Sequence, residues 1–290
     1  MHAYMIIAHN QFELLEKLIL SLDDERNDIY IHIDAKVKDF DFDFFSELTK
    51  HSAVSFTDKR FSIRWGGFDM VRAEYALLEK ALSNGTKYEY IHLLSGIDLP
   101  IKSNDEIHSF FTKNNGREFL HFTSKCLNDT EFDRIRAYHF APGRRNVINR
   151  IITKLESKTA RAFGINRIKN LDVQKGSQWF SITGEFAKYV LDNKNFVFKQ
   201  FKYTFIPDEF FVQTLLINSP FKDKLFKNEL DNDHFACARL IDWKRGNPYV
   251  WTMEDYDEIM SSPCMFARKF DYENQPEIVD KILSDIILEK

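Results

Sequence analysis

Two adjacent acids stand where the sequence predicts the start of a helix. Asp208 and Glu209 follow Pro207 in "PDEFFVQTLLINS" (207–219), and a proline followed by acids is typical of a helix N-terminus. A carboxylate at this point that faces a cleft could accept a proton from a reacting hydroxyl group. Acids are also favoured there simply by the positive end of the helix dipole. The residues alone leave both interpretations open.

Three cationic residues near the C-terminus could bind a phosphorylated ligand. Arg239 lies in "ARLIDW" (238–243), and Arg268 and Lys269 lie in "FARKFD" (266–271). Charge-assisted contacts from such residues can stabilise a departing diphosphate without a metal ion. Because neighbouring residues of a strand face opposite sides, we expect Arg268 to face away from any ligand that Lys269 binds. Each of them, taken alone, is more often a surface charge.

Paired aspartates that could hold a divalent metal are not where such a site would need them. The Asp-x-Asp pairs lie in "DFDFD" (39–43), "DND" (231–233) and "DYD" (255–257), in loops or at helix starts. A metal-bridging pair should instead follow a buried strand. At that place, in "HLLSGIDLP" (92–100), a single carboxylate occurs, Asp98. We therefore expect no metal and no other cofactor.

Alternating strand and helix patterns predict the elements that position these side chains. Apolar runs predict strands at 3–9, 28–34, 53–56, 88–95, 118–122, 177–183, 235–243 and 265–269. Helical spacing predicts helices at 12–22, 40–50, 69–82, 104–113, 147–162, 184–193, 207–219 and 275–288. Repeated β-α units of this length indicate an α/β protein with a mostly parallel central sheet flanked by helices.

Two polar residues end the first two predicted strands. His9 and Asp34 would therefore lie at the same rim of the sheet, where ligands of such sheets bind. A carboxylate there can hydrogen-bond a ribose or a base edge. Structural roles are about equally consistent with this pattern.

The stretch "RWGGFDMV" (64–71) places two glycines directly before a predicted helix. Such a pair favours a turn with positive φ or a close approach of backbone to a ligand. No Gly-x-Gly-x-x-Gly follows the first strand and no P-loop motif occurs, so Rossmann-type dinucleotide binding and P-loop NTPases are disfavoured. The hydrolase motifs Gly-x-Ser-x-Gly and His-Glu-x-x-His are also absent from the sequence.

Composition indicates an ordinary globular protein with one unusual segment. The 290 residues are 44% hydrophobic and 29% charged, with three cysteines that lack metal-ligand spacing. Between Arg134 and Lys175, eleven Lys or Arg residues stand against two acids. Such a block can meet nucleic acid, anionic lipid or a phosphorylated ligand, or can simply be a solvated face. No RNA-binding motif accompanies it, so we expect no nucleic-acid partner.

Seven stretches, in this order, resemble one family: the core-2/I-branching β-1,6-N-acetylglucosaminyltransferases together with the peptide O-xylosyltransferases. No single stretch is diagnostic, but together they extend from residue 3 to 271. The basic stretch 123–175 falls between them and receives no role. The matching stretches are "AYMIIAHN", "YIHIDAK", "RWGGFDMV", "YIHLLSGIDLPIKS", "KGSQWFSIT", "PDEFFVQTLL" and "FARKFD".

The resemblance implies a GT-A-like nucleotide-sugar transferase fold and an inverting, metal-independent reaction. We expect one domain over 1–290, with a nucleotide-binding half (1–122), a basic insertion (123–175) and an acceptor and catalytic half (176–290). Glu209 takes the position of the catalytic base, which leaves Asp208 as a helix-capping acid. The implied nucleotide-sugar-binding residues are Ile7, His9, Asp34, Trp65, Arg239 and Lys269.

The expected function is transfer of a sugar from a UDP-sugar to a glycan acceptor. UDP-GlcNAc is the favoured donor and UDP-xylose the alternative. A non-catalytic nucleotide- or glycan-binding protein on the same fold is the alternative from another class. The N-terminus lacks a signal peptide or membrane anchor pattern. We therefore expect a cytoplasmic, bacterial-type protein, peripheral at the inner face of the membrane, that acts on a lipid-linked glycan in surface polysaccharide assembly.

Overall fold

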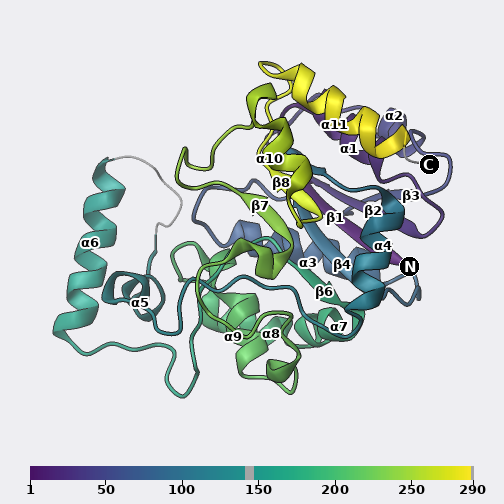
Figure 1. The fold of residues 1–290 in the computed structure, drawn as a ribbon. Helices are drawn as coiled ribbons and strands as arrows, with labels where there is room; N and C mark the ends of the chain where they lie inside the picture. Colours follow the sequence, from purple (N-terminus) through teal and green to yellow (C-terminus); the bar gives the residue numbers. More distant parts are fainter. Residues whose placement is uncertain (141–146, 289–290) are drawn as a thin grey trace.

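The computed structural model describes residues 1–140 and 147–288 and contains a five-stranded central sheet (Figure 1). In the strand order β3-β2-β1-β4-β6, the first four strands run parallel to one another, and β6 is antiparallel to β4. This confirms the predicted α/β class with a mostly parallel sheet. The strands are β1 (His2–Ala8), β2 (Asn27–Ile33), β3 (Ala53–Phe56), β4 (Tyr90–Ser95) and β6 (Ser181–Thr183).

Both faces of the sheet are covered by helices, as the run of apolar residues in β1 requires. Met5 and Ile7 belong to one apolar cluster, and Tyr4 and Ile6 belong to another on the opposite face. Helices α3 (Asp69–Leu82) and α7 (Gly184–Asp192) contribute to the first cluster, whereas α1 (Phe12–Ser21) and α11 (Pro276–Leu288) contribute to the second. Figure 1 shows these two pairs of helices on opposite sides of the sheet.

A second, three-stranded sheet brings together residues that are far apart in the sequence. Its strand order is β5-β8-β7, from β5 (Asp98–Pro100), β8 (Phe266–Arg268) and β7 (Arg239–Ile241). Strand β8 is antiparallel to β5 and parallel to β7, and its register sets Arg268 directly opposite Asp98. The sequence did not predict β5.

Further helices complete the chain, and α6 coincides with its predicted range. The α-helices are α2 (Phe42–Ser46), α4 (Asn104–Lys113), α5 (Asp129–Arg136), α6 (Val147–Ala162), α8 (Lys194–Phe201), α9 (Phe211–Ile217) and α10 (Tyr256–Ser261). Short 3₁₀ helices are η1 (Pro207–Glu209), η2 (Lys222–Lys224), η3 (His234–Cys237) and η4 (Met253–Asp255). No helix in the described part of the chain combines the length and apolar character needed to cross a bilayer.

Three predicted elements differ from the structure. The strand at 118–122 is wrong, because only single bridges occur there, Glu118 with Leu225 and Phe119 with Ser181. The strand predicted at 235–243 divides into η3 and β7, and the helix predicted at 207–219 divides into η1 and α9. In each case the apolar run is short, and tertiary contacts rather than its periodicity determine the local structure.

Candidate functional site

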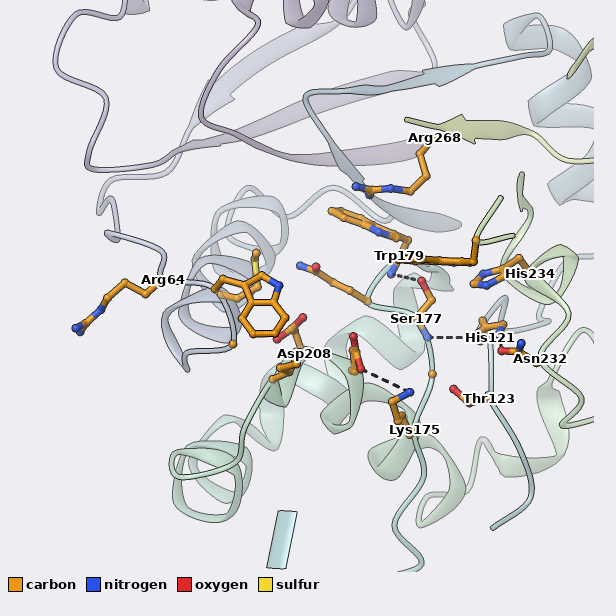
Figure 2. A pocket seen from close by; sticks show the side chains of 18 residues that line it. Arg64, His121, Thr123, Lys175, Ser177, Trp179, Asp208, Asn232, His234 and Arg268 are labelled. Carbon is orange, nitrogen blue, oxygen red and sulfur yellow. Dashed lines mark hydrogen bonds and ion pairs between the residues drawn. The ribbon is translucent and has the colours of Figure 1, made fainter. Parts of the chain in front are cut away.

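A cavity of about 460 Å³ lies where η1, the loop before β6 and the end of β8 meet (Figure 2). The loop before α3 and the segment around η3 complete its wall. These are loops and element ends positioned by the two sheets, as is usual for binding sites. Residues that line it include Trp65, Gln178, Trp179, Asp208, Glu209 and Arg268.

Gly66 lets the loop before α3 approach the chain just ahead of η1. Its φ is +76°, and a Cβ atom there would lie 2.7 Å from the ring of Phe205. The backbone N–H of Ile206 donates to the Gly66 carbonyl over 3.0 Å. The neighbouring Trp65 is 50% exposed and packs edge-on against Phe205, with ring centroids 5.6 Å apart. The glycine is therefore needed for a turn that sets Trp65 in the cavity wall.

Asp208 lies in the cavity wall with an unusually basic carboxylate. Asp208 is 8% exposed. Burial raises the pKa of its carboxyl group to about 7, and the negative charge of Glu209 contributes to this increase. The interpretation of Asp208 as a helix-capping acid is wrong, because Asp208 lies within η1 and the N-cap position belongs to Ile206, whose side chain makes no capping hydrogen bond. A carboxyl group that titrates near neutral pH in a cavity is instead suited to proton transfer.

A fully buried acid stands behind Asp208. Burial raises the pKa of Glu74 well above its ordinary value, and the charge of Asp208 raises it further. Its Oε1 accepts a hydrogen bond of 2.8 Å from the amide Nε2 of Gln178, a residue of the cavity wall. Glu74 is thus held uncharged, and it fixes the orientation of the Gln178 amide.

Glu209, the predicted base, lies in the cavity between two cations. Its carboxylate is 2.9 Å from Nη2 of Arg134 and 3.7 Å from Nζ of Lys175. Its backbone carbonyl accepts from the N–H of Gly176 over 2.9 Å. Arg134 and Lys175 belong to the basic stretch to which the sequence analysis assigned no role. The excess of positive charge in that stretch was the sequence feature that could have indicated their place in the site. The two cations orient the Glu209 carboxylate in the cavity wall.

Arg268 reaches the cavity, contrary to the strand-alternation prediction. Its guanidinium lies 4.0 Å from the ring centroid of Trp179, as Figure 2 shows, and 3.3 Å from the carboxylate of Asp98. Its Nη1 is the atom that pairs with Asp98, and it is buried without a hydrogen bond that meets the geometric criteria in the described part of the chain. A buried guanidinium with unused hydrogen-bonding capacity in a cavity wall is suited to an anionic ligand.

The two cations named from the sequence lie elsewhere. Arg239 is 1% exposed, and its guanidinium donates to Ser181 Oγ and to the carbonyls of Leu93 and Phe180 at 2.6 to 3.1 Å. Lys269 is half-buried one residue beyond β8 and does not line the cavity. Diphosphate binding stays a prediction for both residues, and the interior position of Arg239 favours a structural role instead.

Ile7, His9 and Asp34 lie at the ends of β1 and β2, outside this cavity. The Asp34 carboxylate accepts from the N–H of Ile63 over 3.1 Å, which ties the strand end to the loop that carries Trp65. Partial burial lowers the pKa of His9, and the charge of Asp34 opposes this shift. The structure therefore brings His9 and Asp34 to one rim, and their contact with a uridine stays a prediction.

Two stacked histidines form a wall that the sequence did not reveal. The rings of His121 and His234 are 4.0 Å apart and parallel, and the exposed Trp243 lies 6.4 Å from His234. Burial lowers the pKa of His234 to about 3, so the pair is uncharged at neutral pH. The wall is aromatic and neutral, in contrast to the charged region around Glu209.

No cluster of three or more His, Cys, Asp or Glu side chains suited to a metal ion occurs within residues 1–140 and 147–288. Asp98 is already engaged, since it accepts from Ser95 N at 2.9 Å and Ser95 Oγ at 2.7 Å and pairs with Arg268. Of the aspartates in "DND", Asp233 caps η3 and pairs with Lys227. Metal independence stays a prediction.

Comparisons with known proteins identify the family. The model of the Core-2/I-Branching enzyme family matches residues 2–268, and the chain belongs to this family. Xylosyltransferase 2 of Rattus norvegicus is 26% identical over 96% of this chain, and xylosyltransferase 1 of Homo sapiens is 24% identical over 97%. The chain spans about a third of the length of these relatives, 33% and 30% respectively. A crystal structure of mouse xyloside xylosyltransferase 1 shows only a weak overall likeness, with a TM-score of 0.38 and 10% identity over 92% of this chain and 97% of that one.

Proposed function

We propose that this protein is an inverting glycosyltransferase that moves a sugar from a UDP-sugar to a hydroxyl group of a glycan acceptor. Membership of the Core-2/I-Branching enzyme family supports this class of reaction. The observation that carries the proposal is the pair Asp208 and Glu209 in the wall of a cavity of about 460 Å³. The cavity also offers the cation Arg268 and three indole rings, those of Trp65, Trp179 and Trp243.

In the proposed reaction, Glu209 accepts the proton of the acceptor hydroxyl. The oxygen attacks the anomeric carbon from the side opposite the diphosphate. The bond between that carbon and the diphosphate oxygen breaks, and its electron pair leaves with UDP. Arg268 is the cavity cation best placed to stabilise the charge that grows on the leaving group. Arg134 and Lys175 orient the Glu209 carboxylate before substrate binds.

The donor sugar has two candidates. The sequence pattern favours UDP-GlcNAc, whereas the relatives named above are xylosyltransferases and favour UDP-xylose. The deciding experiment measures UDP release and product mass with each donor in parallel. The class of enzyme would be abandoned if neither donor, nor any other UDP-sugar, yields UDP or product with a panel of glycan acceptors.

A binding protein without catalytic activity is the competing class. The cavity-facing acid with a pKa near 7 argues for chemistry rather than binding alone. Titration calorimetry with UDP, combined with the UDP-release assay, separates the two. Binding without turnover over the full donor and acceptor panels would favour the binding protein.

The proposed acceptor is a growing glycan on a lipid diphosphate carrier, and the proposed place of action is the cytoplasmic face of a membrane. Absence of RNA-binding motifs in the sequence argues against a nucleic-acid partner for the basic segment. Transfer to a lipid-linked oligosaccharide, compared with the free oligosaccharide, tests the acceptor class.

A further inference from the structure

Helix α6 exposes its apolar residues to solvent. The stripe, defined as Val147, Ile148, Ile151, Ile152 and Leu155, has side chains that are 37% to 70% exposed. These positions are separated by one, three and four residues, so they lie on one face of the helix. Figure 1 shows α6 at the edge of the molecule, away from the central sheet. A stripe of this kind normally packs on the protein core.

Several polar contacts hold α6 to the rest of the protein. Glu156 pairs with His139 at 3.0 Å and accepts from the N–H of Phe140 at 3.2 Å. Arg161 pairs with Asp133 of α5. Glu156 lies one helical turn beyond Ile152, at the border of the stripe, whereas Ala160, a further turn along, is buried. Helix α6 thus contacts the protein through polar side chains and Ala160, and leaves the aliphatic residues of the stripe exposed.

The charge around the stripe has one sign. Lys154 and Lys158 are exposed on α6, whereas the exposed Arg161 is paired with Asp133. Glu156 is the single acidic residue in the sequence of α6, and its carboxylate pairs with His139. The exposed surface of α6 thus combines aliphatic and cationic side chains. Phe163, 78% exposed directly beyond the helix, adds an aromatic ring.

An anionic lipid surface matches both chemistries. Its headgroups attract Lys and Arg, while its acyl boundary accepts aliphatic and aromatic side chains. A second copy of the chain would bring the same cationic residues face to face, which opposes a symmetric contact through this helix. We propose that α6 docks on an anionic membrane with the stripe buried at the headgroup boundary. This surface rests on the proposed action at a membrane and names the element that would make the contact, while vesicle binding can be measured separately from sugar transfer.

Vesicle flotation tests the proposal without any enzyme assay. Wild-type protein should float with phosphatidylglycerol–phosphatidylcholine vesicles, and much less with pure phosphatidylcholine. Binding should weaken as salt is raised. The double variant Ile151→Asp with Leu155→Asp should lose binding at least about ten-fold. Because both residues are exposed, circular dichroism and the melting temperature should be unchanged.

Two matched variants make the result specific. Leu20→Asp with Ile287→Asp makes the same chemical change at exposed residues of α1 and α11, and should float like wild type. Lys154→Glu with Lys158→Glu should reduce binding to anionic vesicles strongly, since each lost charge alone costs about five-fold in partitioning. The proposal is overturned if the wild type does not float, or if the stripe variant floats equally well. It is also overturned if light scattering shows a dimer that the stripe variant abolishes, because a second copy then covers α6.

Discussion

The carboxylate of Glu209 lies 2.9 Å from Nη2 of Arg134, a residue 75 positions earlier in the chain. This contact joins the predicted base to the basic segment that the sequence left without a role. Lys175, at the other end of that segment, approaches the same carboxylate at 3.7 Å. The segment therefore contributes directly to the electrostatics of the candidate site, whatever else it binds.

The first prediction concerns proton transfer. Glu209→Gln should lower the rate of sugar transfer about 10²- to 10⁴-fold, because an amide cannot accept the proton of the acceptor hydroxyl. UDP affinity, measured by calorimetry, should change little. Near wild-type transfer by this variant would remove Glu209 from the role of base.

Asp208 should give the activity a dependence on pH near neutrality. Its pKa of about 7 means that it loses its proton as the pH rises through this value. The deprotonated Asp208 adds a second acceptor for the proton of the acceptor hydroxyl in the cavity wall. We expect kcat/KM of the wild type to rise between pH 6 and 8, and Asp208→Asn to show a flatter profile there. Identical profiles for both proteins would contradict this coupling.

The same group should affect stability with the opposite dependence on pH. The ordinary pKa of Asp208 is 3.8 and the folded value is about 7, so the folded state retains the proton that the unfolded state has lost. This contribution is fully present below about pH 4 and is lost as the pH rises through about 7. Its upper bound is about 4 kcal/mol in the free energy of unfolding. Asp208→Asn should therefore raise the melting temperature more at pH 8 than at pH 4.5. An equal change at both pH values would refute the assigned shift.

Sequence reasoning was most successful where burial is governed by local periodicity. The apolar run of β1 and the helical spacing of α3 and α6 are local patterns, and the structure confirms these elements. Trp65, Asp208, Glu209 and Arg268 all lie in stretches that the sequence singled out and line the cavity. The interpretation of Asp208 as a helix-capping acid failed because the residues around it, Glu74 and Gln178, come from distant parts of the chain.

The orientation of Arg268 was not predictable from alternation. Strand β8 has three residues and ends at Arg268, so Lys269 lies outside the region where alternation holds. Arg239 shows a related limit. Its sequence context is that of a cation near a strand end, and only the tertiary structure reveals that backbone carbonyls surround its guanidinium.

Arg239 should therefore matter for folding. Arg239→Ala removes the donor from buried carbonyls of Leu93 and Phe180, each worth about 1–3 kcal/mol when left unsatisfied. We expect a large fall in the melting temperature, and Arg239→Lys should restore it only in part because lysine lacks the planar fork. A normal melting temperature combined with a lower kcat would instead support the diphosphate role predicted from the sequence.

Activity should survive EDTA. The carboxylate nearest the place expected for a metal, Asp98, is already held by Ser95 and Arg268. The check is UDP release before and after chelation, with Mn²⁺ and Mg²⁺ added back. Loss on chelation that either ion reverses would show that the reaction needs a metal.

The comparison of Arg268 with Lys269 decides which cation serves the leaving group. Arg268→Ala should lower kcat about 10²-fold, because its guanidinium faces the cavity over Trp179. Lys269→Ala should be mild. Arg268→Ala also leaves the buried Asp98 without its cation, so the double variant Arg268→Ala with Asp98→Asn is the control. If Arg268 binds the diphosphate, the double variant should regain stability without regaining activity. Recovery of both would give Arg268 a purely structural role. Greater damage from Lys269→Ala than from Arg268→Ala would restore the assignment made from the sequence.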